Sequence, residues 1–155
     1  MMTNLTCDVI KALKGKTLVT AESCTGGGIG AALTAVPGSS AVYKGGVVSY
    51  TNDVKMGVLG VPSEWIDKYG AVSPWVAMEM ASGVRGLLHT DVAVSVTGLA
   101  GPGGDEYGHP VGTVYIAYED RQRNGVHHYL FEGDRESVRQ QAVEAALKLI
   151  LLYNE

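Results

Sequence analysis

Apolar side chains recur every three or four residues in four segments, a spacing that places them on one face of a helix. The first pattern begins behind Asn4, the expected N-cap, and stops at Gly15; the last begins behind Asp134. Pro74 is expected to open a further helix, because proline suits the first helical position. A short helical piece is also expected at residues 62–70. The four longer expected helices and their core positions are residues 4–14 (Leu5, Val9, Ile10, Leu13), 27–36, 74–89 (Val76, Met80, Val84, Leu87, Leu88) and 135–153 (Val138, Val143, Ala146, Leu147, Ile150).

β-Branched and alternating apolar runs predict five strands, at residues 16–23, 41–50, 91–98, 110–119 and 125–133. The second run contains Gly45 and Gly46, which indicate an interruption or a bulge. The last two runs flank "DRQRN", a typical hairpin turn region. Because strands and helices alternate early and a hairpin closes the chain, we expect an α/β fold: a three-layer α/β/α sandwich with a mixed sheet of about five strands.

Length and composition restrict the function classes. The 155 residues, 46% of them hydrophobic and 18% charged, suit one globular domain over residues 1–155. A net charge of −4 without a basic run argues against nucleic-acid binding. Two cysteines point to a reducing compartment, and no run approaches the ~20 apolar residues of a membrane span. We therefore expect a soluble cytoplasmic protein without a membrane partner.

Familiar cofactor motifs do not fit the glycine-rich loops. Residues 98–104 follow a strand but run into another strand, whereas a dinucleotide-binding fingerprint must open a helix. The chain has no Walker motif and no G-x-S-x-G elbow. The four histidines do not lie at metal-ligand spacing, so we expect neither a metal nor an organic cofactor.

Ser23 lies between an expected strand and an expected helix, in "TLVTAESCTGGGIGAAL". It could cap the helix, since serine accepts hydrogen bonds from first-turn N–H groups. It could also be the reactive group of a site whose N–H groups favour negative charge. The residues alone leave both interpretations open.

A second candidate segment is "SYTNDVK", in which Asn52 is the expected cap of a short helix with Lys55 in its first turn. Tyr50 ends the preceding strand, so Tyr50 and Lys55 should reach the same sheet edge. A cation early in a helix is disfavoured by the dipole, which singles out Lys55, although a solvated lysine is the commoner case. A catalytic lysine would have to lose its proton more easily than usual.

Three segments together resemble the signature blocks of the CinA C-terminal domain family: "TAESCTGG", "SYTNDVK", and "VTGLAGPGG" followed by "PVGTVYIAY". They occur in the family's order and at its spacing. The similarity extends over nearly the whole chain, including the late segment "GDRESVRQQAVEAAL". One such block would be weak support, whereas three in order are specific.

The resemblance implies a PncC-type deamidase, a hydrolase that converts nicotinamide mononucleotide and water into nicotinate mononucleotide and ammonia in pyridine-nucleotide salvage. It implies Ser23, Tyr50 and Lys55 as the catalytic residues, without a cofactor. The segments that match the family's pocket supply the expected substrate-binding residues Cys24, Thr25, Gly26, Gly27, Thr97, Gly98, Gly101, Gly103 and Arg139, with Arg135 as the neighbouring candidate. Residues 105–109 receive no role, and the N-terminal pyrophosphatase-linked domain of longer members is not expected here.

In this chemistry Ser23 attacks the carboxamide, and either neutral Lys55 or a Tyr50 phenolate takes its proton. The sequence leaves that choice open. The N–H groups of residues 24–28 are expected to stabilise the oxyanion or a phosphate. The alternative function is a catalytically silent nucleotide- or RNA-binding module, because the fold type is similar to anticodon-binding domains. We also expect a homo-oligomer, with a dimer favoured, through the apolar segment of residues 62–80.

Overall fold

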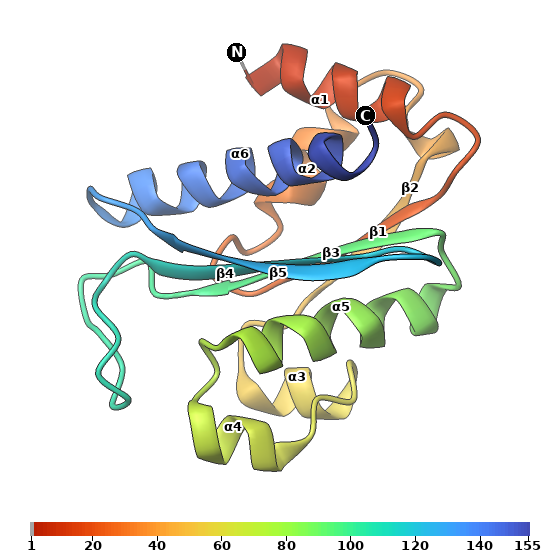
Figure 1. Cartoon of the computed structure of the whole chain (residues 1–155). Coiled ribbons are helices and arrows are strands. Elements are labelled where there is room, and N and C mark those ends of the chain that lie inside the picture. The colour runs from red at the N-terminus through yellow and green to blue at the C-terminus, as the bar shows by residue number, and fades with distance from the viewer. Residues whose placement is uncertain (1) are drawn as a thin grey trace.

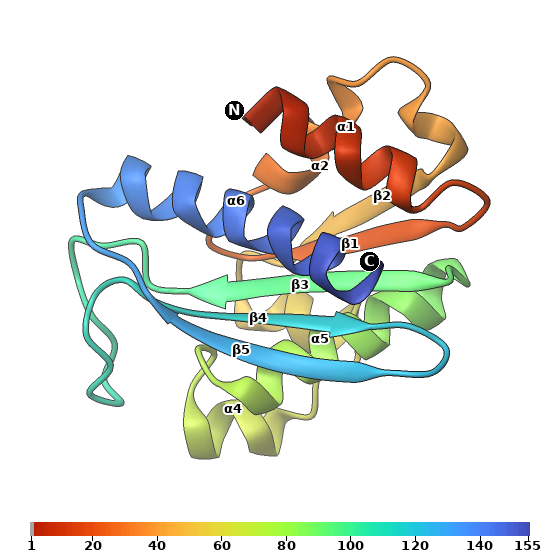
Figure 2. The ribbon, with the colours of Figure 1, turned by 45° about the horizontal axis from the view of Figure 1, so that its top comes forward.

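Five strands form one mixed sheet in a computed structural model that describes residues 2–155. Across the sheet the strands are β2 (Tyr43–Val48), β1 (Leu18–Glu22), β3 (Val92–Gly98), β4 (Thr113–Glu119) and β5 (Asn124–Leu130). Strands β2, β1 and β3 are parallel, whereas β4 and β5 run antiparallel to their neighbours. The mixed sheet of five strands expected from the sequence is therefore confirmed, and Figure 2 shows β5 at one edge.

Helices cover both faces of this sheet (Figure 1). One face carries α1 (Met2–Ala12), α2 (Gly28–Thr34) and α6 (Arg135–Tyr153), and the other carries α3 (Asn52–Gly57), α4 (Ser63–Tyr69) and α5 (Pro74–Leu88). Each face has its own cluster of buried apolar side chains. The three-layer α/β/α arrangement thus follows, because each helix buries one apolar face and the central strands β1 and β3 are buried on both faces. Among residues 2–155, no helix combines the length and the hydrophobicity needed to cross a bilayer.

Several local expectations are confirmed. The Asp134 side chain caps α6 by accepting the Ser137 N–H, and Pro74 lies in the first turn of α5 behind the capping side chain of Ser73. Strand β2 has the expected irregularity, because its register against β1 shifts between Tyr43 and Gly45.

Three expectations about helix ends and faces are wrong. Asn4 lies inside α1, which begins at Met2, so Asn4 is not its cap. Asn52 is the first residue of α3, so it is not the cap. The residue in the cap position is Thr51, whose side chain makes no capping hydrogen bond. Leu87 is 50% exposed, since the face defined by Val76, Met80 and Val84 continues at Leu88 instead.

The topology brings distant segments to one edge of the sheet. Parallel strands β1, β2 and β3 all end there, and the antiparallel β5 ends there as well, since Leu130 pairs with the first residue of β4. The residues that follow these strands, together with the first turn of α6, therefore meet at the carboxyl ends of the parallel strands. This edge is the usual place for ligands in open α/β sheets.

Candidate active site

Ser23 follows β1 at this edge, and its backbone is hydrogen-bonded to the neighbouring strand β3. Its N–H donates to Val96 O at 2.9 Å, and only 7% of the residue is exposed. The chain then turns sharply through Gly26 (φ 60°) and Gly27 (φ 101°), left-handed conformations that glycine adopts without strain. The turn directs the chain into α2 and leaves Ser23 at its start.

Glu22, and not Ser23, caps α2. Its buried carboxylate accepts the N–H of Ile29 at 2.8 Å, the N–H of Gly30 at 3.0 Å and the Thr25 hydroxyl at 2.7 Å. A carboxylate at a helix N-terminus also interacts favourably with the helix dipole. The capping interpretation of Ser23 is therefore wrong, and the side chain of Ser23 is available for another role.

Two of the N–H groups expected to bind an anion are already used within the loop. The N–H of Gly26 donates to Ser23 O at 3.0 Å, and that of Gly28 donates to Thr25 O at 3.0 Å. Because Glu22 occupies the start of α2 as well, neither these two N–H groups nor the first turn of α2 is free to bind a substrate anion. The tight turn itself consumes these donors.

Lys55 is the partner of Ser23. Its Nζ donates to Ser23 Oγ at 3.0 Å and to Ser49 O at 2.8 Å, and the residue is 2% exposed. Ser49 is itself fixed, because its N–H donates to Glu22 O at 2.7 Å. Burial, which disfavours the charged amine, lowers the pKa of Lys55 to about 8. Lys55 is therefore a buried amine directed at a serine, not a solvated lysine.

A cavity of about 480 Å³ opens beside Ser23 and Lys55. Eight of the residues expected from the sequence line it: Ser23, Cys24, Tyr50, Lys55, Thr97, Gly98, Gly101 and Gly103. Four others do not belong to its wall, namely Thr25, Gly26, Gly27 and Arg139. The structure thus brings together the ends of β1, β2 and β3, as the topology requires.

Tyr50 lies at the cavity but is turned toward α6. The residue is 57% exposed, and its hydroxyl accepts a hydrogen bond from Arg135 Nη2 at 2.9 Å. Arg135 Nη1 donates to Gly101 O at 2.6 Å, so Arg135 joins Tyr50 to the glycine-rich loop. Of the two candidate bases, Lys55 is the one hydrogen-bonded to Ser23.

The two arginines of α6 have different surroundings. Arg135 lines the cavity, whereas Arg139 donates from Nε to Cys24 O at 3.0 Å and from Nη2 to Thr25 O at 3.2 Å. Arg139 therefore fastens α6 to the loop after Ser23, and Arg135 is the arginine placed to meet a ligand. Both side chains lie on one side of the helix, four residues apart, so sequence spacing could not distinguish them.

The loop between β3 and β4, residues 99–112, forms the outer wall of the site. It is braced by Asp105, whose carboxylate pairs with His109 Nδ1 at 2.7 Å, and by Tyr107, whose hydroxyl donates to Asp67 O at 2.9 Å. A second cavity of about 490 Å³ lies along this loop and shares Asn52, Ala71, Val72 and Leu99 with the first. Within residues 2–155, no group of three His, Cys, Asp or Glu side chains could hold a metal ion.

Sequence reasoning missed Glu22 and Ser49 as parts of the site. The residues around Glu22 have the pattern of a buried strand, which gives Glu22 no evident role. Its role becomes clear only from the N–H groups of α2 that its carboxylate accepts. Ser49 acts through its carbonyl, which carries no side-chain signal. Asn52 lines both cavities, whereas its place in the sequence indicates only a helix cap.

Comparisons with known proteins agree with the signature blocks. A sequence model described as the CinA C-terminal domain matches residues 2–153. A CinA-like protein of Desulfotalea psychrophila is 47% identical over 140 residues, which are 90% of this chain and 34% of that protein. The chain spans about a third of the length of such curated relatives.

Solved structures show the same fold. The competence or damage-inducible protein from Enterobacter asburiae superposes with a TM-score of 0.97 at 34% identity, covering 100% of this chain and 99% of that one. A CinA superfamily protein from Klebsiella pneumoniae superposes with a TM-score of 0.94 at 39% identity, covering 97% and 95%.

Proposed function

The chain belongs to the CinA C-terminal domain family, and we propose that it is an amidohydrolase that converts nicotinamide mononucleotide and water into nicotinate mononucleotide and ammonia. One observation carries the proposal: the buried amine of Lys55 lies 3.0 Å from the Ser23 hydroxyl at the wall of a cavity. A serine paired with a base is the arrangement used for nucleophilic attack on an amide carbon.

In the proposed reaction, neutral Lys55 accepts the Ser23 hydroxyl proton while Ser23 Oγ attacks the carboxamide carbon. The tetrahedral intermediate collapses when Lys55 returns the proton to the nitrogen, and ammonia leaves with formation of a seryl ester. Water then attacks the ester with Lys55 as base, which releases the carboxylate and restores Ser23. The Ser49 carbonyl orients Lys55 throughout, since it accepts from the same Nζ at 2.8 Å.

Two further groups support a nucleotide rather than a free amide as substrate. Arg135 is the guanidinium at the cavity, and guanidinium groups bind phosphate through paired, charge-assisted hydrogen bonds. Tyr50 is hydrogen-bonded to Arg135 and is exposed enough to contact a ribose or a phosphate. We assign to these two residues the phosphoribosyl part of the substrate, while Ser23 and Lys55 act on the amide.

The test is ammonia release by the purified chain with nicotinamide mononucleotide and, separately, with free nicotinamide. The nucleotide should be deamidated, and nicotinamide should be a poor substrate because it has no phosphate for Arg135. Equal turnover of the two compounds would remove the nucleotide pocket from the proposal. Binding of the nucleotide without any ammonia release would favour the silent binding module instead.

A further inference from the structure

Residues 99–103 of the loop between β3 and β4 line the cavity beside Ser23, and the loop extends from the sheet edge alongside α4 (Figure 1). The base of the loop is fixed to the sheet, because the Leu99 N–H donates to Thr113 O at 2.9 Å and the Gly112 N–H donates to Leu99 O at 2.8 Å. Within the described part of the chain, no backbone–backbone hydrogen bond involves residues 100–109. The position of this cavity wall therefore depends on side chains.

Two side chains hold the outer part of the loop, one on each face of the sheet. On the face of α6, Arg135 Nη1 donates to Gly101 O at 2.6 Å. On the face of α4, the Tyr107 hydroxyl lies 2.9 Å from Asp67 O and 3.2 Å from Ile66 O. Carbonyl groups in the last turn of a helix lack some of their helical partners. Tyr107 therefore joins the loop to the end of α4.

The ring of Tyr107 packs directly on Gly70, the residue after α4. A Cβ atom at Gly70 would lie 2.6 Å from Tyr107 Cδ1, and the φ of 80° at this position favours glycine as well. The next two residues, Ala71 and Val72, line the cavity beside Ser23 from the opposite side to residues 99–103. The contact between Tyr107 and Gly70 thus joins two walls of one cavity.

Each of these walls is held in shape by its own hydrogen bonds. The Asp105 carboxylate accepts the N–H of Tyr107 at 3.1 Å and the N–H of His109 at 3.0 Å, and it pairs with His109 Nδ1 at 2.7 Å. On the other wall, Thr97 Oγ1 donates to Ala71 O at 2.8 Å. Because both walls are braced separately, the Tyr107 contact sets the distance between them.

We propose that Tyr107 is a positioning residue, which holds residues 99–103 over the cavity and so determines how closely the substrate is enclosed. The kinetic part of this inference rests on the proposed function. Arg135, the other anchor of the loop, is also the group assigned to the substrate phosphate. Tyr107 does not line the cavity, so a bound substrate does not compete for its hydrogen bonds. Its loss should weaken substrate binding more than the reaction of Ser23 and Lys55.

The first experiment compares the steady-state turnover of nicotinamide mononucleotide by Tyr107→Phe and by the wild-type chain. Phenylalanine keeps the ring on Gly70 and removes the hydroxyl. KM should rise about threefold to tenfold, as expected for one lost hydrogen bond. The value of kcat should change less than about twofold, because the lost interaction affects binding and not the chemical step.

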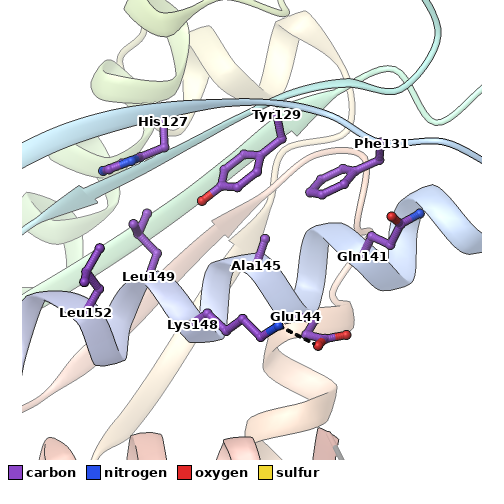
Figure 3. Close-up of a pocket in the computed structure, with 9 residues that line it drawn as sticks. All are labelled: His127, Tyr129, Phe131, Gln141, Glu144, Ala145, Lys148, Leu149 and Leu152. Atoms are coloured by element: carbon purple, nitrogen blue, oxygen red, sulfur yellow. Dashed lines mark ion pairs between the residues drawn. The ribbon is translucent and has the colours of Figure 1, made fainter.

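Tyr153→Phe is the matched control. Its hydroxyl is bonded to His127 Nε2 at 3.0 Å, and His127 lies in a separate groove between β5 and α6 (Figure 3). This variant also loses one tyrosine hydroxyl, and its KM should equal that of the wild-type chain. An active Tyr107→Phe protein with wild-type KM would overturn the proposal.

A second pair of variants tests the contact from the side of α4. Gly70→Ala should raise KM, because the added methyl group displaces the ring of Tyr107. In a Tyr107→Ala background the ring is absent, so Gly70→Ala should raise KM much less. An equal rise in both backgrounds would overturn the proposal, since it would assign the effect to backbone strain at residue 70.

Amide hydrogen exchange of the substrate-free protein tests the same contact without catalysis. Residues 100–109 should exchange about threefold to tenfold faster in Tyr107→Phe than in the wild-type chain, while the central strands keep their protection. Unchanged exchange of residues 100–109 would overturn the proposal. A wild-type chain that releases no ammonia would count against the proposed function alone, and the exchange comparison would then decide the role of Tyr107.

Discussion

Lys55 combines a buried amine with a hydroxyl, that of Ser23, within hydrogen-bonding distance. Burial lowers its pKa to about 8, so a useful fraction of the amine is neutral near physiological pH. A neutral amine can accept the proton of Ser23, whereas an ammonium group cannot. The same burial that disfavours the charge therefore gives Lys55 a larger neutral fraction at neutral pH than an exposed lysine with a pKa near ~10.4.

Cys24, the residue next to Ser23, does not compete as the nucleophile. Burial raises the pKa of its thiol to about 11, so the thiol stays protonated at neutral pH. The thiolate is the reactive form of cysteine. Lys55 is hydrogen-bonded to the Ser23 hydroxyl, so the geometry favours Ser23 over the protonated thiol of Cys24 as the nucleophile.

The pKa of Lys55 predicts how activity depends on pH. Below pH 8 the amine is mostly protonated and inactive, and its neutral fraction rises about tenfold for each pH unit until it levels off above the pKa. Turnover of nicotinamide mononucleotide should therefore increase with pH and flatten above about 8. The measurement is kcat/KM across the pH range in which the fold is stable. A flat profile from pH 6 to 9, or one that falls as pH rises, would contradict the assignment of Lys55 as the base.

At the scale of elements, α6 joins the site to the rest of the fold. Its first turns carry Arg135 at the cavity and Arg139 on the loop after Ser23, while its later turns cover the sheet. Replacement of Arg135 should therefore affect substrate binding, whereas replacement of Arg139 should affect stability.

Arg135→Gln should raise KM for nicotinamide mononucleotide about 10- to 100-fold with a smaller effect on kcat, since a hydrogen bond to a charged group contributes about 1.5–3 kcal/mol. Arg139→Gln, the matched control, should lower the melting temperature instead, because it removes two bonds to the backbone of residues 24 and 25. Steady-state kinetics and thermal melts separate the two effects. A larger KM effect from a folded Arg139→Gln protein would show that the roles are reversed.

The elements themselves are largely predictable, because their apolar positions follow regular patterns. Strands β1 and β3 are short runs buried on both faces, and α6 has an apolar stripe through Val138 and Ile150. The errors lie at helix ends, where Asn4 and Asn52 are common capping residues and local propensity is a weak guide. In the site, Ser23 and Lys55 can be singled out from the sequence by residue type and position. Glu22 cannot be recognised as the cap of α2, because that role depends on which N–H groups lie beside its carboxylate in the folded chain.

At the scale of the whole molecule, the site exists because parallel strands end at one edge. Ser23 and Lys55 are 32 residues apart in the chain, and Arg135 lies beyond five further elements, yet all of them line one cavity. No local pattern specifies these distances. The family signature blocks indicate which residues belong to the site. Only the order of the strands in the sheet explains why Lys55 reaches Ser23 and why Tyr50 is directed toward Arg135.

Replacement of the proposed catalytic pair tests the central claim most directly, through turnover of nicotinamide mononucleotide by Ser23→Ala, Lys55→Met and the double variant. Lys55→Met should lose about 10²–10⁴-fold in kcat, as expected for removal of a general base. Ser23→Ala should lose as much or more, and the double variant little beyond that, because the two residues act as a unit. Methionine keeps the buried stem and removes an amine whose charge is disfavoured by burial, so the melting temperature should not fall.

The predicted result is therefore a folded Lys55→Met protein, by its melting curve, that releases almost no ammonia. A folded Lys55→Met protein with full activity would contradict the account, because Ser23 would then be activated by some other group.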